Sequence, residues 1–143
     1  MMENPVNEPG TKELMHFIQK ARSVSDILRI MDESSGLPTI GRYINTIREE
    51  KGLKKEALFA SAGVSVAYGY EIIHESKRPS RDTLLRFAFA FQMNVEETQK
   101  LLKIGEKAVL YPKLRRDAHI IYALTNGLNL TEFNTSAVDL KIL

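Results

Sequence analysis

Basic side chains gather between residues 39 and 81 of this 143-residue sequence. This stretch holds eight Lys/Arg against five Asp/Glu, a net charge of +3, whereas the whole chain carries +2. Ammonium and guanidinium groups bind phosphate oxygens, and a cluster of them is the electrostatic footprint of a nucleic-acid contact. These residue types therefore suggest binding of a phosphate backbone. The cations that could make such contacts are Lys54, Lys55, Lys77, Arg78 and Arg81.

Two short helical runs joined by a tight turn must position these cations. Between residues 54 and 62, small and apolar side chains recur at helical spacing. Gly63 then permits the positive φ that ends a helix and reverses the chain. Ser65 is a good N-cap for a second run, in which Tyr68 and Ile72 lie four residues apart on one face. This pattern predicts a helix-turn-helix, a pair of helices that cross steeply.

Further motifs follow one another in order along the same stretch. They are Arg48-Glu49, Gly52, Glu56-Ala57-Leu58, Ala62-Gly63-Val64-Ser65, Ile72 and Lys77-Arg78-Pro79-Ser80. In this order they resemble the phage-repressor-like (Xre-type) helix-turn-helix family, from Thr39 to Lys103. The resemblance implies an all-α protein with a lambda-repressor-like five-helix DNA-binding domain. It also implies a transcriptional regulator that binds double-stranded DNA as a homodimer, because one such module contacts few base pairs.

The resemblance also implies which residues face the DNA. The residues that would face base edges in the major groove are Ser65, Val66, Ala67 and Tyr70, with Glu71 beside them. The five cations named above would hold phosphates. Lys54-Lys55 stands where family members carry a Thr/Ser-Gln pair that contacts the DNA backbone.

The composition of the second helix of the pair leaves an alternative function open. None of its base-facing residues is Arg, Lys, Asn or Gln, the types suited to bidentate base contacts. Glu71 could accept a hydrogen bond from cytosine N4, but its charge repels phosphate. Gly69 either weakens its helix by up to ~1 kcal/mol or permits close approach of another backbone. Tyr68 is expected in the core, whereas Tyr70 is expected to point outward, to a base or to a protein. The alternative is a protein-interaction adaptor built on the same helices.

Residues 1–38 predict an N-terminal helical arm. Residues 1–10 are polar and predict a loose segment. Thr11 is the expected N-cap of a first helix, and Ser23 or Ser25 is the expected start of a second. The two apolar stripes are Leu14, Phe17, Ile18 and Ala21, then Val24, Ile27, Leu28 and Met31. These helices either pack on the rest of the chain or form a dimerisation arm.

Residues 39–104 predict the helix-turn-helix domain itself. Thr39, Ser80 and Asn94 are expected N-caps, and Gly52 and Gly105 are expected helix ends. The helix that follows Ser80 should be the most buried one. Its apolar residues are Leu84, Leu85, Phe87, Ala88 and Phe91.

Residues 105–143 predict a C-terminal helical extension and a surface for a protein partner. One helix is expected over residues 113–126, with an inner face of Leu114, Ala118, Ile121, Tyr122 and Leu124. Thr131 is the expected N-cap of a last helix, with inner residues Phe133, Ala137, Val138 and Leu140. The run Tyr111-Pro112 to Arg116-Asp117 resembles a C-terminal extension of some Xre-type proteins. Arg115-Arg116-Asp117 is expected to form a surface ion pair or a helix-start cap.

Enzymatic function classes find no support in the sequence. It has no cysteine, and His16, His74 and His119 fall on three different predicted elements. No metal-ligand, nucleophile or phosphate-loop motif occurs, so we expect no catalytic residue, metal or cofactor. No apolar run approaches the ~18 residues of a membrane span, and no signal peptide precedes the fold. A cytoplasmic protein without a membrane partner is expected.

Overall fold

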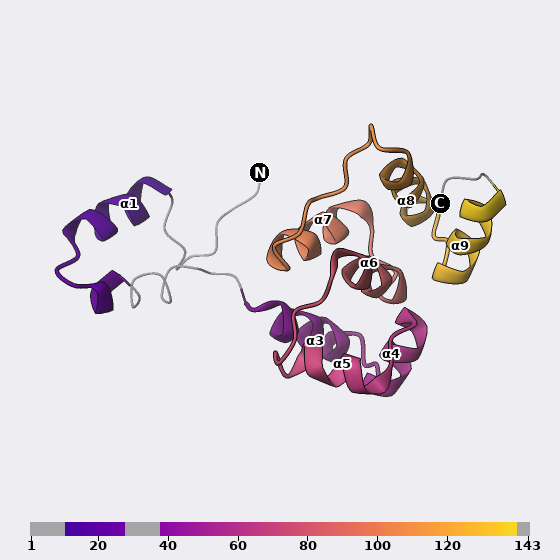
Figure 1. Ribbon diagram of the computed structural model, residues 1–143, viewed down its shortest axis with the longest axis horizontal. Coiled ribbons are helices and arrows are strands. Elements are labelled where there is room, and N and C mark those ends of the chain that lie inside the picture. The colour runs from indigo at the N-terminus through magenta and orange to yellow at the C-terminus, as the bar shows by residue number, and fades with distance from the viewer. Residues whose placement is uncertain (1–10, 28–37, 140–143) are drawn as a thin grey trace. The chain divides into compact units, whose positions relative to one another are not determined.

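The computed structural model describes residues 11–27 and 38–139, and all regular secondary structure in these residues is helical (Figure 1). The all-α class is confirmed. The chain divides into two units, Met1–Pro38 and Thr39–Leu143, and the predicted domain boundaries stay predictions. No described helix is long and apolar enough to cross a bilayer. The helices are α1 Thr11–Lys20, α3 Ile40–Glu50, α4 Lys55–Ala62, α5 Val66–Ile73, α6 Arg81–Ala90, α7 Val95–Ile104, α8 Arg115–Thr125 and α9 Leu130–Asp139.

The first unit contains α1 and a short helical stretch at residues 24–27. Ser23 begins that stretch, because its Oγ accepts a hydrogen bond from the Asp26 amide at 3.1 Å. Of the two predicted starts, the structure selects Ser23. Val24 is 72% exposed. Leu28, Met31 and the predicted polar segment at residues 1–10 lie outside the described residues.

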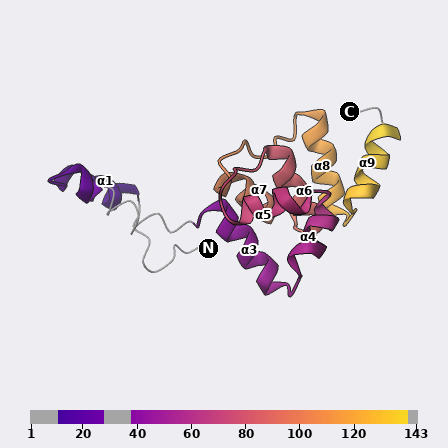
Figure 2. The ribbon, with the colours of Figure 1, turned by 60° about the horizontal axis from the view of Figure 1, so that its bottom comes forward.

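Helix α6 forms the centre of the second unit, with α4, α7 and α9 in contact with it (Figures 1 and 2). Its N-cap is Ser80, whose Oγ accepts from the Thr83 amide at 3.2 Å. Six of its ten residues are buried, more than in any other described helix. The prediction that the helix after Ser80 is the most buried is confirmed.

Most other predicted helix limits of this part are confirmed as well. Thr39 is the N-cap of α3, and Gly52 follows the end of α3 with a φ of 69°. Asn94 and Glu97 form a capping box at the start of α7, with hydrogen bonds of 2.8 and 2.9 Å. Gly105 ends α7.

The predicted inner face of α8 is confirmed only in part, since Leu124 is buried and Ile121 packs against the core, but two other members are exposed. The helix begins at Arg115 rather than Lys113, and Tyr122, predicted on the inner face, is 60% exposed. Leu114, also predicted inside, is the N-cap and is 54% exposed. The prediction went wrong because a carboxylate was assigned to the surface, whereas Asp117 lies on the buried side. The buried residues of α8 are Asp117, His119, Ile120, Ala123 and Leu124.

Helix α9 begins earlier than predicted, so Thr131 is not its cap. Asn129 and Glu132 exchange two hydrogen bonds of 2.8 Å, each from a backbone amide to the other side chain. An Asn followed three residues later by Glu is a capping-box signal that was present in the sequence. Phe133 is buried, as predicted. The side chains of Ala137, Val138 and Leu140 lie outside the described part of the chain.

Candidate nucleic-acid interface

Helices α4 and α5 are joined by the tight turn predicted at Gly63. Gly63 ends α4 with a φ of 68°, a left-handed conformation that glycine adopts without strain. Ser65 is the N-cap of α5, and its Oγ accepts from the Tyr68 amide at 3.1 Å. The predicted pair of helices and its turn are therefore present. Below, the solvent side of α4, α5 and residues 74–80 is called the outer face.

Phe59 and Gly69 hold the two helices together. Phe59 is fully buried, and a Cβ on Gly69 would lie 2.5 Å from two atoms of its ring. A glycine at this position lets the ring lie directly against the backbone of α5. The close approach that Gly69 permits is therefore made by a side chain of α4, not by a second backbone.

The start of α5 is open to solvent. Ser65, Val66 and Ala67 are exposed, and Val66 keeps 50% of its surface. The hydroxyl of Ser65 already serves as the cap, so the two apolar side chains are the groups that remain. Methyl groups at this position suit the C5-methyl group of thymine or an apolar protein surface.

Tyr70 contacts α4, so the prediction that it points outward is wrong. It is half-buried, and its Oη donates to Glu56 Oε2 at 2.5 Å. Its ring meets Phe59 edge-on with centroids 5.4 Å apart. The hydrogen bond from Tyr70 lowers the pKa of Glu56, and the same bond raises the pKa of Tyr70. Tyr68 is half-buried and packs against the core, as predicted.

Lys54 and Lys55 lie at the beginning of α4, beside this tyrosine. Lys54 is the N-cap residue and is exposed, whereas Lys55 is half-buried with its Nζ 5.6 Å from the centroid of the Tyr70 ring. After the hydrogen bonds of Glu56, the positive charges of both lysines also lower the pKa of this carboxyl. Lys54 and Lys55 therefore both lie close to the carboxylate of Glu56.

The two cations that follow α5 are exposed and are paired with carboxylates. Lys77 Nζ lies 3.5 Å from Glu71 Oε2, and Arg78 Nη1 lies 3.0 Å from Glu106 Oε1. The side chains of Lys77 and Arg78 are 59% and 83% exposed. Exposed pairs of this kind contribute ~0–1 kcal/mol, so both cations remain open to a phosphate. Glu71 itself is half-buried.

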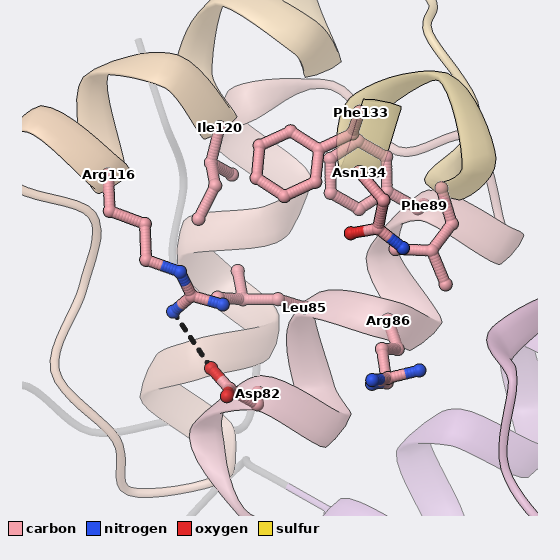
Figure 3. Close-up of a pocket in the computed structure, with 9 residues that line it drawn as sticks. Asp82, Leu85, Arg86, Phe89, Arg116, Ile120, Phe133 and Asn134 are labelled. Atoms are coloured by element: carbon pink, nitrogen blue, oxygen red, sulfur yellow. Dashed lines mark hydrogen bonds and ion pairs between the residues drawn. The ribbon is translucent and has the colours of Figure 1, made fainter. Parts of the chain in front are cut away.

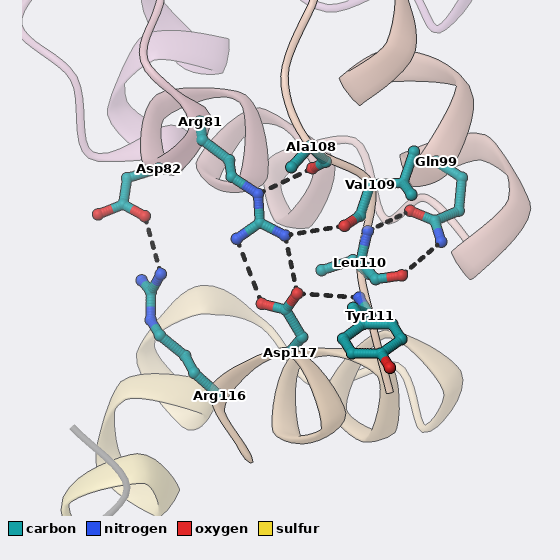
Figure 4. A network of polar contacts seen from close by, with 9 residues as sticks. All are labelled: Arg81, Asp82, Gln99, Ala108, Val109, Leu110, Tyr111, Arg116 and Asp117. Carbon is teal, nitrogen blue, oxygen red and sulfur yellow. Dashed lines mark hydrogen bonds and ion pairs between the residues drawn. The ribbon is translucent and has the colours of Figure 1, made fainter. Parts of the chain in front are cut away.

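Arg81 is half-buried and its guanidinium is bound by a buried carboxylate and by backbone carbonyls (Figure 4). Its Nη1 and Nη2 donate to the two oxygens of Asp117 at 3.2 and 2.9 Å, and its Nε donates to the Ala108 carbonyl at 2.9 Å. The Asp117 side chain is only 3% exposed. Burial alone would raise the pKa of Asp117, but hydrogen bonds from Arg81 and the Tyr111 amide bring the pKa below its ordinary value. The ion pair of Asp117 is therefore largely buried, whereas Arg116 forms the predicted surface ion pair, with Asp82.

The same network attaches the segment before α8 to α6 and α7. Gln99 holds both backbone groups of Leu110, with its Oε1 accepting at 2.7 Å and its Nε2 donating at 3.0 Å (Figure 4). Arg116 donates to Asp82 Oδ1 at 2.9 Å. Sequence reasoning missed Gln99 and Glu56, because nothing local connects either residue to its partner.

The described residues offer one serine–histidine pair, but no metal cluster. They contain no group of three or more His, Asp or Glu that could hold a metal ion. His119 Nε2 lies 2.6 Å from Ser136 Oγ, but the buried Nδ1 of this histidine has no partner. A nucleophilic Ser–His pair needs a third group that orients the imidazole, and this pair has none among the described residues.

No protein-family model matches the chain, and no significant match is found among curated proteins or solved structures.

Proposed function

We propose that the protein is a DNA-binding transcriptional regulator of the Xre type. In this proposal α3 to α7 form a lambda-repressor-like five-helix domain, with further helices before and after it. The observation that carries the proposal is the exposed start of α5, capped by Ser65, together with Lys54 and Lys55 at the start of α4, where Lys55 Nζ lies 5.6 Å from the ring centroid of Tyr70 on α5. An exposed, capped helix start in a two-helix unit that also carries exposed cations suits a major groove between two phosphate backbones.

Phosphate contacts supply most of the affinity in this proposal. Lys54, Lys55, Lys77 and Arg78 are the cations of the outer face, and Arg81 is left out because its donors are bound to Asp117 and to backbone carbonyls. Val66 and Ala67 supply apolar contacts in the groove. The protein acts in the cytoplasm as a homodimer in this proposal, because one module contacts only a few base pairs.

Fluorescence anisotropy on a labelled random duplex across a salt series tests the proposal. Each phosphate contact adds about 0.9 to the slope of log affinity against log salt. Lys54→Ala/Lys55→Ala should therefore reduce the slope by about 1.8 per chain. Lys103→Ala/Lys113→Ala, which removes two exposed lysines elsewhere, should leave it unchanged. Absence of binding at low salt, or equal slopes for the two variants, would refute the proposal.

A protein-interaction adaptor is the second candidate, and the pairing of charges on the outer face favours it. Glu56, Glu71 and Glu106 lie beside the cations, and Val66 is exposed at the start of α5. A photo-crosslinking amino acid at Val66 separates the two functions. An adduct that nuclease digests supports the regulator, and an adduct that only protease digests supports the adaptor.

A further inference from the structure

One side of α8 faces solvent although it is apolar. Tyr122 and Leu114 are 60% and 54% exposed, and Ala118, midway between them, is half-buried. Residues four positions apart lie on the same side of a helix, so these three side chains form one row. Ile121, which packs partly against the core, borders this row. These four residues are the α8 stripe.

The other side of α8 already attaches this helix to the rest of the protein. Ile120 and Phe133 of α9 point into the same small pocket (Figure 3). Arg116 donates to Asp82 Oδ1 at 2.9 Å, and Asp117 is paired with Arg81. Packing within the described part of the chain therefore accounts for this side of α8 but not for the α8 stripe.

The solvent side of a helix normally carries charged residues, and α7 follows this rule. All four of its exposed residues are charged, namely Glu96, Glu97, Lys100 and Lys103. The exposed residues of α8 are Arg115, Tyr122 and Thr125, so its one exposed charge lies in the first turn. Depletion of charge together with an exposed tyrosine is typical of the centre of a protein–protein interface.

The spacing of the α8 stripe is self-complementary. Leu114 and Tyr122 each lie four residues from Ala118. A second α8 that runs antiparallel and crosses at Ala118 therefore presents the same residues in reverse order, as an interface with twofold symmetry requires. The small side chain of Ala118 permits close approach of the two helices. In this register Leu114 lies beside Ile121 of the second copy.

The one exposed charge of α8 favours the antiparallel direction. Arg115 and Tyr122 are seven residues apart, roughly two turns, so they lie on the same flank of the helix. In the antiparallel register the guanidinium of Arg115 meets the ring of Tyr122 of the second copy, a favourable cation–π contact. It also approaches the carboxyl end of that helix, which has no basic residue in its last turn and attracts a cation. In a parallel pair the two Arg115 side chains would repel each other.

We propose that the α8 stripe binds a second copy of this chain, with the two α8 helices antiparallel and crossing at Ala118. This assigns a surface to the homodimer of the proposed function. The interface has few residues in each chain, so the dimer is a weak one that dissociates on dilution.

Sedimentation velocity of the full chain, from micromolar to millimolar concentration and without DNA, measures this association. We expect a sedimentation coefficient that rises with concentration from monomer to dimer. Tyr122→Lys places an ammonium group against Arg115 of the second copy and should raise the dissociation constant at least about tenfold. Thr131→Lys adds the same charge at an exposed position of α9 and should associate as the wild type does. A monomer at every concentration, or equal association of Tyr122→Lys and the wild type, would overturn the proposal.

The double variant Arg115→Glu/Tyr122→Lys tests the direction of the helices. Across an antiparallel interface the new carboxylate meets the new ammonium group, so association should recover to within about threefold of the wild type. A parallel pair gains no such contact, and a double variant as weak as Tyr122→Lys would refute the antiparallel register. Both residues are exposed, so circular dichroism should show unchanged helix content.

A single thiol at the crossing point gives an independent test. The sequence has no cysteine, so Ala118→Cys places the one thiol of each chain where the two helices meet. Oxidation should link two chains of Ala118→Cys on a non-reducing denaturing gel, and should link Thr131→Cys far less. Equal linkage of the two variants would refute the crossing at Ala118. DNA is absent from all three tests, so their failure leaves DNA contact by the outer face untouched, and absence of DNA binding leaves this interface untouched.

Discussion

Substitution of Gly69 by alanine sets two physical effects against each other. Alanine in place of glycine inside a helix is favourable by up to ~1 kcal/mol. At this position, however, the new Cβ would lie 2.5 Å from the ring of Phe59, well inside the ~3.5–4.0 Å at which carbon atoms pack best. Phe59 has no exposed surface, so its ring cannot turn into solvent. Overpacking of a dense core costs about 1–3 kcal/mol, and the clash should outweigh the gain in helix propensity.

We therefore expect Gly69→Ala to lower the free energy of unfolding by up to about 2 kcal/mol, as measured by urea unfolding followed by circular dichroism. Ala67→Gly is the matched control, since this exposed position on the same helix reports propensity alone. A Phe59→Leu background gives the second control. The smaller side chain makes room for the Cβ, and Gly69→Ala should then become neutral or stabilising. Stabilisation by Gly69→Ala in the wild type would refute the argument from packing.

The remaining predictions concern charges and caps. Asp117→Asn should lower the free energy of unfolding by about 2–3 kcal/mol at pH 7, somewhat less than for a fully buried pair, because Arg81 is 25% exposed. Since the folded-state pKa of Asp117 is depressed, the stabilisation is present above the unfolded-state pKa of about 3.9 and is lost as the pH falls through the folded-state pKa. The difference between the two proteins in urea unfolding should shrink below about pH 4, and a constant difference down to pH 2 would contradict this. Asn129→Ala should cost about 1 kcal/mol in the same assay and Thr131→Ala only a few tenths, and equal effects would speak against the assigned cap. Glu71→Gln should strengthen binding to random duplex by roughly two- to fivefold, and an unchanged affinity would count against DNA contact by the outer face.

Helix limits could be predicted from the sequence where one residue decides them. Ser65, Ser80 and Asn94 each make the expected cap hydrogen bond to an amide three residues later. Such a bond depends only on the cap and on the backbone beside it, so a short window of sequence contains the whole cause. The buried stripe of α6 could be predicted as well, because the helices that contact α6 on its two sides, α4 and α7, also contribute apolar residues to the core.

Pairings between distant residues could not be predicted in this way. Arg81 and Asp117 are 36 residues apart, and Tyr70 and Glu56 are 14 apart. Each of these side chains has many partners of suitable chemistry in the sequence, and only the fold selects one. The assignment of Asp117 to the surface also affected the prediction for α8. With the Asp117 carboxylate taken for a surface group, Leu114 and Tyr122 were wrongly assigned to the inner face of α8.

These pairings also limit what the outer face offers to a phosphate backbone. Lys77 lies in an exposed pair, which contributes ~0–1 kcal/mol, so a phosphate replaces Glu71 at little cost. Arg81 is different, because release of its guanidinium would leave Asp117 buried and unpaired, at a cost of about 3–5 kcal/mol. One contact with a DNA phosphate does not offset this free-energy cost. We therefore expect Arg81 to stay paired with Asp117 in any complex with DNA.

Four cations per chain then remain for phosphate contacts, namely Lys54, Lys55, Lys77 and Arg78. At about 0.9 for each contact, the salt slope should be at most about 3.6 for a monomer and about 7 for a homodimer. The magnitude of the slope thus reports how many chains bind each duplex. A slope near 1 would mean that the carboxylates of the outer face prevail over its cations, and the adaptor would then be the better explanation of this surface.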